Sequence, residues 1–251
     1  MGGAGVALAG AGRSWFELDF VDAAGLRRLE GLGVCSGVAF EYAAPVRAFR
    51  WSKGQRNFAG WWWSATTGRH VGYESWLERD HAMLLDFDPQ VVAFASQPFW
   101  LHWIAGERHR RHAPDFFARR ADGTGVVIDV RADERVEAAD AEAFAATERA
   151  CAEAGWTFHR VGTPDAVLVA NVGWLSRYRH PRCGARQEVA DRLLEVFVQP
   201  MGLFEGVAEV GDRLEVLPVC YHLLWRQVLV GDLAGGPLSP VTRICRAGGG
   251  R

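Results

Sequence analysis

The chain of 251 residues is poor in lysine, because Lys53 is the only one and the rest of its 28 Lys and Arg residues are arginines. Positive charge is not in excess either: 30 Asp and Glu residues bring the formal net charge to -2. A chain without a global basic field does not attract nucleic acid over its whole surface. Any DNA contact must therefore use a local basic patch, and that patch must be built from arginine.

Cysteines, leader-like segments and long apolar runs are also scarce. The five cysteines are widely spaced, no Cys-x-x-Cys occurs, and their number is odd, which argues against a zinc knuckle or a disulfide framework. Residues 1–15 lack the basic and apolar regions of a signal peptide, and no apolar run approaches the roughly 18 residues of a membrane span. We expect a cytoplasmic protein with reduced thiols and no membrane contact.

The middle of the chain, residues 57–163, alternates helix and strand signals and predicts an α/β core. Ser75 followed by Glu78 predicts a capping box that opens an amphipathic helix over 75–86. The run 125–131 (GVVIDVR) is almost wholly apolar, which is typical of a strand buried on both faces. Further strands are predicted at 91–95, 99–104, 113–118 and 156–161, and a second helix at 138–153.

Two other regions flank this core. Residues 1–56 form an N-terminal extension, in which 46–51 is expected to pair with 57–64 as a β-hairpin. The run Trp61-Trp62-Trp63 suggests either a strand packed on both faces or a stacking platform for bases, and the packed strand is favoured. Residues 164–251 carry helical periodicity over 166–178, 186–198 and 216–230 and end in an extended segment at 241–245, which predicts a helical, winged-helix-like module.

Acidic residues in the core form the pattern with chemical content. Glu78 lies on the first predicted helix, Asp115 follows Pro114, and Asp129 interrupts an apolar strand. A buried carboxylate without a partner is costly, and carboxylate oxygens are the ligands that Mg²⁺ or Mn²⁺ prefers. Each residue alone has an ordinary structural explanation, as a cap, a turn residue or a surface ion pair. Together, in this order, they predict a divalent-metal pocket.

The same residues resemble a known family. The order Glu78, Pro114-Asp115 and Asp129-Val130-Arg131 resembles the PD-(D/E)XK nuclease superfamily, of restriction-endonuclease-like fold with a mixed sheet flanked by helices. The flanking strings resemble, more specifically, the TnsA-type endonuclease subunit of heteromeric transposases: 73–80 (YESWLERD), 85–91 (LDFDPQV), Gln97-Pro98 and 113–116 (APDF). The resemblance covers about 57–161 well and extends more loosely into the C-terminal part.

This resemblance implies a metal-dependent endonuclease that hydrolyses one DNA strand, on the 5′ side, at transposon ends. Its partners would be double-stranded DNA, an integrase-type transposase and an ATP-dependent transposition regulator, in a prokaryotic, nucleoid-associated complex. Glu78, Asp115 and Asp129 would bind Mg²⁺ or Mn²⁺, with the Val130 carbonyl as a further ligand. Glu74, four residues before Glu78, is an alternative first ligand.

Arg131 stands where the family usually has lysine. Arginine keeps the positive charge but does not deprotonate a water molecule. If the role is electrostatic, Arg131 serves as a catalytic residue, and the chain-wide use of arginine favours this. Otherwise the protein is a catalytically weak or inactive DNA-binding and assembly subunit. A repair or restriction nuclease of the same superfamily is a third possibility.

Arginines near Asp115 are the predicted DNA contacts. Three of them precede Asp115 and two follow it: Arg108, Arg110, Arg111, Arg119 and Arg120. A second cluster, Arg177 to Arg186, lies at the junction with the C-terminal module and is a candidate contact to DNA or to a partner protein.

Overall fold

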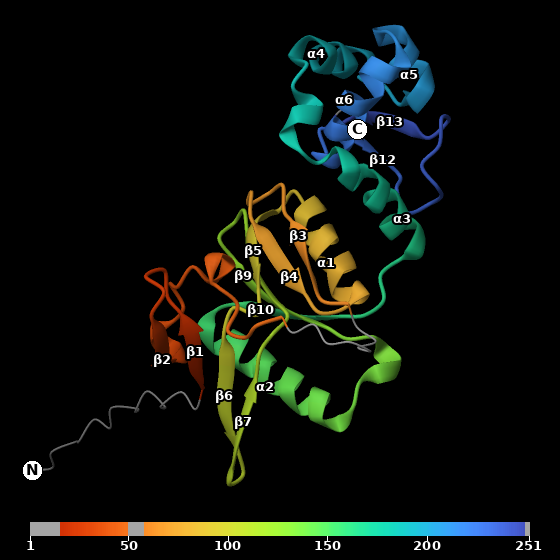
Figure 1. Ribbon diagram of the computed structural model, residues 1–251. Coiled ribbons are helices and arrows are strands. Elements are labelled where there is room, and N and C mark those ends of the chain that lie inside the picture. The colour runs from red at the N-terminus through yellow and green to blue at the C-terminus, as the bar shows by residue number, and fades with distance from the viewer. Residues whose placement is uncertain (1–15, 50–57, 249–251) are drawn as a thin grey trace, which may run out of the picture.

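The computed structural model describes residues 16–49 and 58–248, and a four-stranded sheet lies at its centre (Figure 1). Its strand order is β10-β9-β8-β5, with β9 parallel to β10 and antiparallel to β8. These strands confirm the predicted ones within a few residues. Their bounds are Val91–Ser96 (β5), Phe116–Arg120 (β8), Gly125–Val130 (β9) and Thr157–Val161 (β10).

Two helices cover the opposite faces of this sheet. Helix α1 (Trp76–Phe87) packs on the face that carries Phe94, Phe116 and Ile128, and helix α2 (Ala138–Ala154) packs on the face of Phe117 and Val127. Ser75 caps α1, as predicted, and Gly155 ends α2 with a left-handed φ of 73°. The result is a three-layer arrangement in which strand alternation sends one set of side chains to each helix.

A second sheet of order β2-β1-β6-β7 adjoins the first. It joins β1 (Glu17–Val21) and β2 (Arg27–Gly31) of the N-terminal segment to the hairpin of β6 (Trp100–Ala105) and β7 (Arg108–His112). Strand β7 was not predicted, because its sequence RHRRH has no apolar alternation. Strands β1 and β2 were not predicted either. The N-terminal segment packs into the same hydrophobic core as α2, and in that core the Phe40 ring contacts Trp156, which follows the helix.

The predicted hairpin between 46–51 and 57–64 is wrong in its pairing. Strand β3 (Gly60–Trp63) pairs with β4 (His70–Tyr73), and residues 46–49 belong to no strand. The part of the prediction that falls on 50–57 lies outside the described residues. The connection between β3 and β4 turns at Gly68, whose φ of 66° suits glycine.

The C-terminal part combines helices with a small sheet. The predicted helices appear as α3 (Ala166–Leu175), α4 (Gln187–Val196) and α6 (Arg213–Trp225). The extended segment predicted at 241–245 appears as β13 (Arg243–Arg246). The sequence did not predict α5 (Leu203–Val210), or the antiparallel sheet of order β11-β13-β12 that β13 forms with Met201–Gly202 (β11) and Leu229–Gly231 (β12). Short 3₁₀ turns complete the chain at Leu32–Val34, Phe40–Tyr42, Asp133–Arg135, Ser176–Tyr178 and Pro181–Gly184.

The C-terminal part packs against α1 and the β3–β4 hairpin. Phe87 of α1 contacts Trp225 of α6, with ring centroids 5.3 Å apart, and the Gln227 amide donates to the Phe87 carbonyl. The described structure is thus mixed α/β, as predicted. Among the described residues, every helix is too short or too polar to cross a lipid bilayer.

Candidate active site

A polar cavity of about 320 Å³ opens where α1 begins, β9 ends and α2 begins. The sequence predicted five of the residues that line it as metal ligands or catalytic groups, separated by up to 53 positions along the chain. They are Glu78, Asp115, Asp129, Val130 and Arg131. The alternative ligand Glu74 also lines the cavity. The fold therefore brings every predicted ligand to one place.

Asp115 and Asp129 face one another across two neighbouring strands. The β8–β9 register pairs Phe116 with Ile128, and one further step along it places Asp115 opposite Asp129. Asp129 is buried, and the backbone N–H of Val130 donates to Asp115 Oδ2 at 2.7 Å. Burial raises the pKa of Asp115 well above its usual range, and the nearby Glu78 and Asp129 carboxylates raise it further.

Glu78 has a structural and a site-facing role at once. Its backbone N–H donates to Ser75 Oγ at 3.1 Å, while the Ser75 hydroxyl donates to Glu78 Oε1 at 2.9 Å. The Glu74 N–H donates to Glu78 Oε2 at 2.7 Å. Burial raises the pKa of Glu78, although these hydrogen bonds oppose the shift. Glu78 is thus a member of the capping box that starts α1 and also a candidate metal ligand.

His112 holds the Asp129 carboxylate from the other side. Its Nε2 lies 2.8 Å from Asp129 Oδ1 and 2.9 Å from Oδ2, and the imidazole also meets the Phe144 ring edge-on. Sequence reasoning placed His112 in the basic cluster before Asp115 but did not predict its contact with Asp129. The available signal was its place two residues before Pro114, at the end of a basic run that pairs with β6.

Arg131 lies at the same cavity but its guanidinium is engaged. It forms an ion pair with Asp140 in the first turn of α2, at 2.9 Å from Nη2 to Oδ2, and its Nε donates to the Arg135 carbonyl at 3.2 Å. The side chain is still 41% exposed. Asp140 Oδ2 also accepts from the Glu137 N–H and so caps α2.

Arg47 is a cationic residue of the cavity that sequence reasoning missed. Its Nη2 lies 2.6 Å from Glu74 Oε2. It comes from the segment before the undescribed residues 50–57, and only the tertiary structure brings it to the carboxylates. Glu74 is paired with this arginine, whereas Glu78 is held by its own helix terminus.

The five predicted DNA-contact arginines do not lie together. Arg111 lines the cavity and stacks on Trp100, with its guanidinium carbon 4.4 Å from the ring centroid. Arg108 and Arg110 extend along the same exposed strand β7. Arg119, by contrast, is largely buried in an ion pair with Glu41 at 3.1 Å, and Arg120 borders a different cavity beside α1.

Two further buried polar residues, Asp86 and Gln97, received no predicted role. Asp86 of α1 accepts hydrogen bonds from the Trp62 indole, the Ser64 hydroxyl and the N–H groups of Ala65 and Thr66. Gln97 is buried with a φ of 47°, and its backbone N–H donates to the Asp115 carbonyl at 2.9 Å. Both lie in strings that carried the family resemblance, which was the available signal.

These carboxylates line one cavity without forming a compact cluster. Within 16–49 and 58–248, no group of three His, Cys, Asp or Glu side chains is arranged closely enough to hold a metal ion. Hydrogen bonds to His112, Val130 and the α1 terminus take up oxygens of the three predicted ligands. The available donors are nevertheless those that a hard cation such as Mg²⁺ prefers. They are carboxylate oxygens, some of them buried, whose negative charges repel one another.

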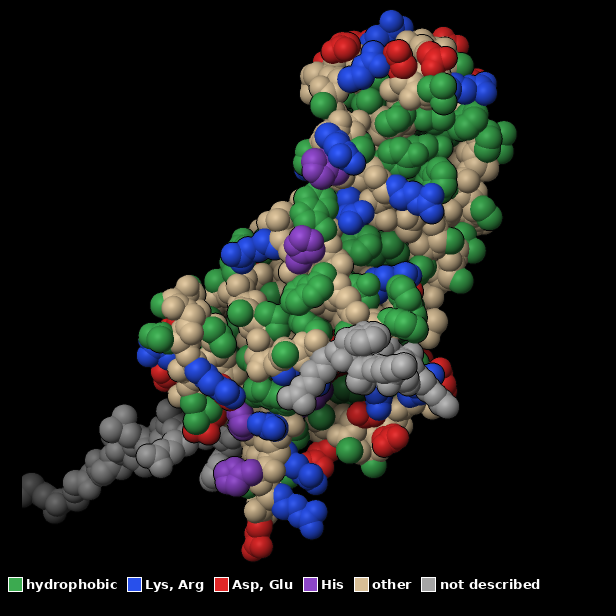
Figure 2. Space-filling model, viewed as in Figure 1, with side chains coloured by type: hydrophobic (Ala, Val, Ile, Leu, Met, Phe, Trp, Pro, Cys, Tyr) green, Lys and Arg blue, Asp and Glu red, His purple; other side chains and the backbone are tan. Residues whose placement is uncertain are grey.

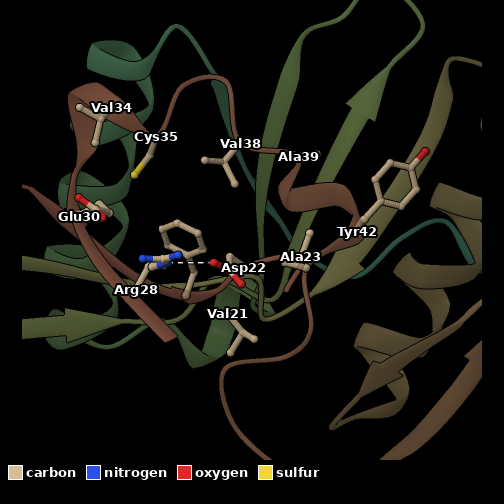
Figure 3. Close-up of a pocket in the computed structure, with 12 residues that line it drawn as sticks. Val21, Asp22, Ala23, Arg28, Glu30, Val34, Cys35, Val38, Ala39 and Tyr42 are labelled. Atoms are coloured by element: carbon tan, nitrogen blue, oxygen red, sulfur yellow. Dashed lines mark hydrogen bonds and ion pairs between the residues drawn. The ribbon is translucent and has the colours of Figure 1, made fainter. Parts of the chain in front are cut away.

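A larger pocket lies elsewhere, between the β1–β2 hairpin and the turn 32–42 (Figure 3). Its volume is about 600 Å³, and it shares no lining residue with the carboxylate cavity. Arg28 and Asp22 on its wall are joined by an ion pair of 2.9 Å and neutralise one another. Its remaining lining is mostly apolar and carries no arrangement of catalytic type among the residues drawn.

Comparison with known proteins bears on the family of the chain. Residues 88–162 match the family model described as the TnsA-like endonuclease N-terminal domain. A search of curated proteins found no match. The matched segment holds β5 to β10 and α2, and so contributes Asp115, Asp129 and Arg131 to the cavity, whereas Glu78 lies just before it. This match over residues 88–162 supports a TnsA-type endonuclease, the family that the sequence motifs resemble.

Proposed function

We propose that this protein is the metal-dependent endonuclease subunit of a heteromeric transposase and that it cuts one strand, on the 5′ side, at transposon ends. The observation that carries the proposal is the meeting of Glu78, Asp115 and Asp129 at one cavity. Restriction-endonuclease-like cores place their acidic residues at such a sheet edge. The strand assignment and the partners come from the family resemblance alone.

The residues present suit Mg²⁺ or Mn²⁺. Their donors are carboxylate oxygens and, at Val130, a backbone carbonyl. The pKa of Asp115 is raised by burial and then by the Glu78 and Asp129 carboxylates, whose negative charge a divalent cation would offset. A bound divalent ion supplies Lewis-acid stabilisation and a water molecule of lowered pKa. Glu78, Asp115 and Asp129 would hold it. His112 would keep the Asp129 carboxylate oriented, as outer hydrogen-bond partners do around metal sites.

Arg131 would act through its charge rather than as a base. A guanidinium stays protonated at any physiological pH and is able to bind phosphate oxygens with two N–H groups. Its partial exposure at the cavity suits contact with the phosphate that is cut. Asp140 competes for the same guanidinium, so DNA binding would require Arg131 to share or leave that ion pair.

The C-terminal part would serve assembly rather than base reading. Its order of helix α4, strand β11, helices α5 and α6, and strands β12 and β13 is the order of a winged-helix module, for which we propose residues 164–251, next to a nuclease core over 57–163. Helix α6 is buried along most of its length, from Val216 to Trp225. A helix so covered is not free to enter a major groove.

A second candidate function is a nuclease-like assembly subunit without turnover. The engagement of Arg131 by Asp140, together with the absence of lysine at this position, favours it. The two candidates differ in turnover but share DNA and partner binding.

The first experiment is calorimetric titration of Mn²⁺ into the native protein and the Asp115→Ala variant. We expect one site in the native protein and its loss in the variant, while Asp122→Ala, which removes an exposed turn carboxylate, leaves binding unchanged.

Nicking of supercoiled plasmid with Mn²⁺, with and without the transposase partner, then separates the candidates. Metal binding without nicking in the assembled complex would support the assembly subunit. Absence of metal binding even with DNA present would contradict the nuclease.

A further inference from the structure

The outer face of the β3–β4 hairpin is unusually aromatic and lies open. Strand alternation turns Trp62 inward, where its indole donates to Asp86, and turns Trp61 and Trp63 outward. Trp61 is 56% exposed. Trp63 stacks on His180 with ring centroids 5.2 Å apart and an interplanar angle of 21°.

Other aromatic rings extend this face toward the carboxylate cavity. The Phe49 ring lies over Gly72, where a Cβ atom would collide with it, and meets the Trp61 ring at 5.1 Å. Phe58 lies 5.8 Å from Trp76, and both are about half exposed. We call the set Phe49, Phe58, Trp61, Trp63 and Trp76 the aromatic strip.

The strip adjoins the cavity through two chain connections. Arg47, which lines the cavity, lies two residues before Phe49 of the strip. Glu74, which also lines it, lies two residues after Gly72 of the supporting strand β4. Two extended residues span about 7 Å. A strand of DNA that reaches the carboxylates is therefore within one or two nucleotides of the first rings.

The charge around the β3–β4 part of the strip is positive. Residues 58–73, which contain both strands and their turn, include no Asp or Glu. Arg69 and His70 are exposed at one end of β4, and Arg179 donates to the Trp63 carbonyl at 3.0 Å with its guanidinium over the Trp62 ring. Figure 2 shows this middle part of the face with basic and hydrophobic side chains interleaved, while acidic side chains gather toward the two ends.

We infer that the aromatic strip binds unpaired nucleotides of the DNA strand that runs through the carboxylate cavity. The inference rests on the proposed function for the presence of DNA, and it adds where and how the strand is held. Exposed indoles with arginines between them are the elements from which proteins build single-strand sites, because each base stacks on a ring and each phosphate meets a cation. Trp61 is the ring with the largest free surface, and it is the central stacking residue.

The test is fluorescence anisotropy with a labelled 15-nucleotide oligodeoxythymidine, in EDTA so that no cleavage takes place. Loss of one stacking ring costs about tenfold in affinity. We expect Trp61→Ala to bind the oligonucleotide about tenfold more weakly and Trp61→Phe to bind it nearly as the native protein does. As a control, Leu29→Ala removes an equally exposed side chain from strand β2 and should have no effect. Circular dichroism melting confirms that each variant is folded.

Several results would overturn the inference. Equal oligonucleotide binding by a folded Trp61→Ala variant would do so, and so would tighter binding of a hairpin duplex than of the single strand. If Trp61→Ala keeps oligonucleotide affinity but loses capture of the transposase partner, the strip is a protein interface instead. Because the readout uses neither metal nor turnover, a failure of the nuclease proposal in the calorimetric experiment leaves this result interpretable.

Discussion

His112 Nε2 contacts both carboxylate oxygens of Asp129, at 2.8 and 2.9 Å, across the edge of the central sheet. This contact ties the last residue of the basic strand β7 to the most deeply buried acid of the candidate active site. Removal of one partner from such a pair leaves a buried charge without its hydrogen bonds.

The His112→Ala variant should therefore be less stable than the native protein. We expect a loss of about 1–3 kcal/mol in the free energy of unfolding without metal, since the buried Asp129 carboxylate would lose its hydrogen-bond partner. Urea denaturation at pH 7.5 measures the change. His109→Ala, on the same strand but exposed, should have almost no effect.

Addition of Mn²⁺ refines that prediction. If the cation binds at Asp129 and His112 orients that carboxylate for it, Mn²⁺ should stabilise the His112→Ala variant less than the native protein, because loss of the outer partner weakens metal binding. An equal response of both proteins would show that the cation does not bind at an Asp129 carboxylate oriented by His112.

Asp115→Asn should raise the thermal stability in metal-free buffer at pH 8. Burial and the nearby carboxylates raise the pKa of Asp115 above its usual 3.8, so the folded protein retains a proton that the unfolded chain releases. Folded stability therefore falls as the pH rises from about 4 to the raised pKa, and the deficit persists above it. Asparagine removes that deficit and still accepts from the Val130 N–H.

We expect a rise in Tm of about 2–4 °C for each kcal/mol regained. The difference between variant and native protein should shrink toward zero near pH 4, where both forms are neutral. A variant that is less stable than the native protein at pH 8 would contradict the assignment of Asp115 to a repulsive carboxylate group. Calorimetric scans across this pH range give the answer.

The Asp86→Ala variant should lose the contacts that hold the β3–β4 hairpin against α1. The carboxylate accepts hydrogen bonds from Trp62, Ser64, Ala65 and Thr66, and its loss leaves the buried Ser64 hydroxyl and three partly buried donors without this acceptor. A cost of about 3 kcal/mol or more is expected, seen as a fall in Tm of roughly 6–12 °C. Asp80→Ala, which removes an ion pair on the same helix with a more exposed partner, should change Tm little.

The Arg119→Ala variant should mainly lose stability, whereas the Arg108→Ala variant should mainly lose DNA affinity. Arg119 is paired with Glu41 and donates to the Gly123 carbonyl, so Arg119→Ala should lose about 1–3 kcal/mol of stability. Arg108→Ala should leave stability within about 0.5 kcal/mol and weaken duplex binding, with a smaller salt dependence. Filter binding at several salt concentrations, beside urea denaturation, tests both halves. A DNA-binding defect confined to Arg119→Ala would reverse our assignment.

Local patterns predicted much of the central layer. The Ser75 and Glu78 spacing gave the start of α1, and the run 125–130 gave β9, because capping and strand burial depend on residues close in sequence. Strand β7 escaped prediction because its pairing with β6 stabilises a run that has no strand pattern of its own. The same holds for β3, whose partner proved to be the segment after it rather than the one before.

For the candidate site, too, some features follow from the sequence and others only from the tertiary structure. The sequence by itself determined where the acidic residues stand and where an arginine follows them, and these residues line one cavity. Only the tertiary structure decided the partners: Asp129 with His112, Arg131 with Asp140, Glu74 with Arg47 and Arg119 with Glu41. The physical reason is that a carboxylate needs some cation or donor nearby, but which one it finds depends on segments that only folding brings together.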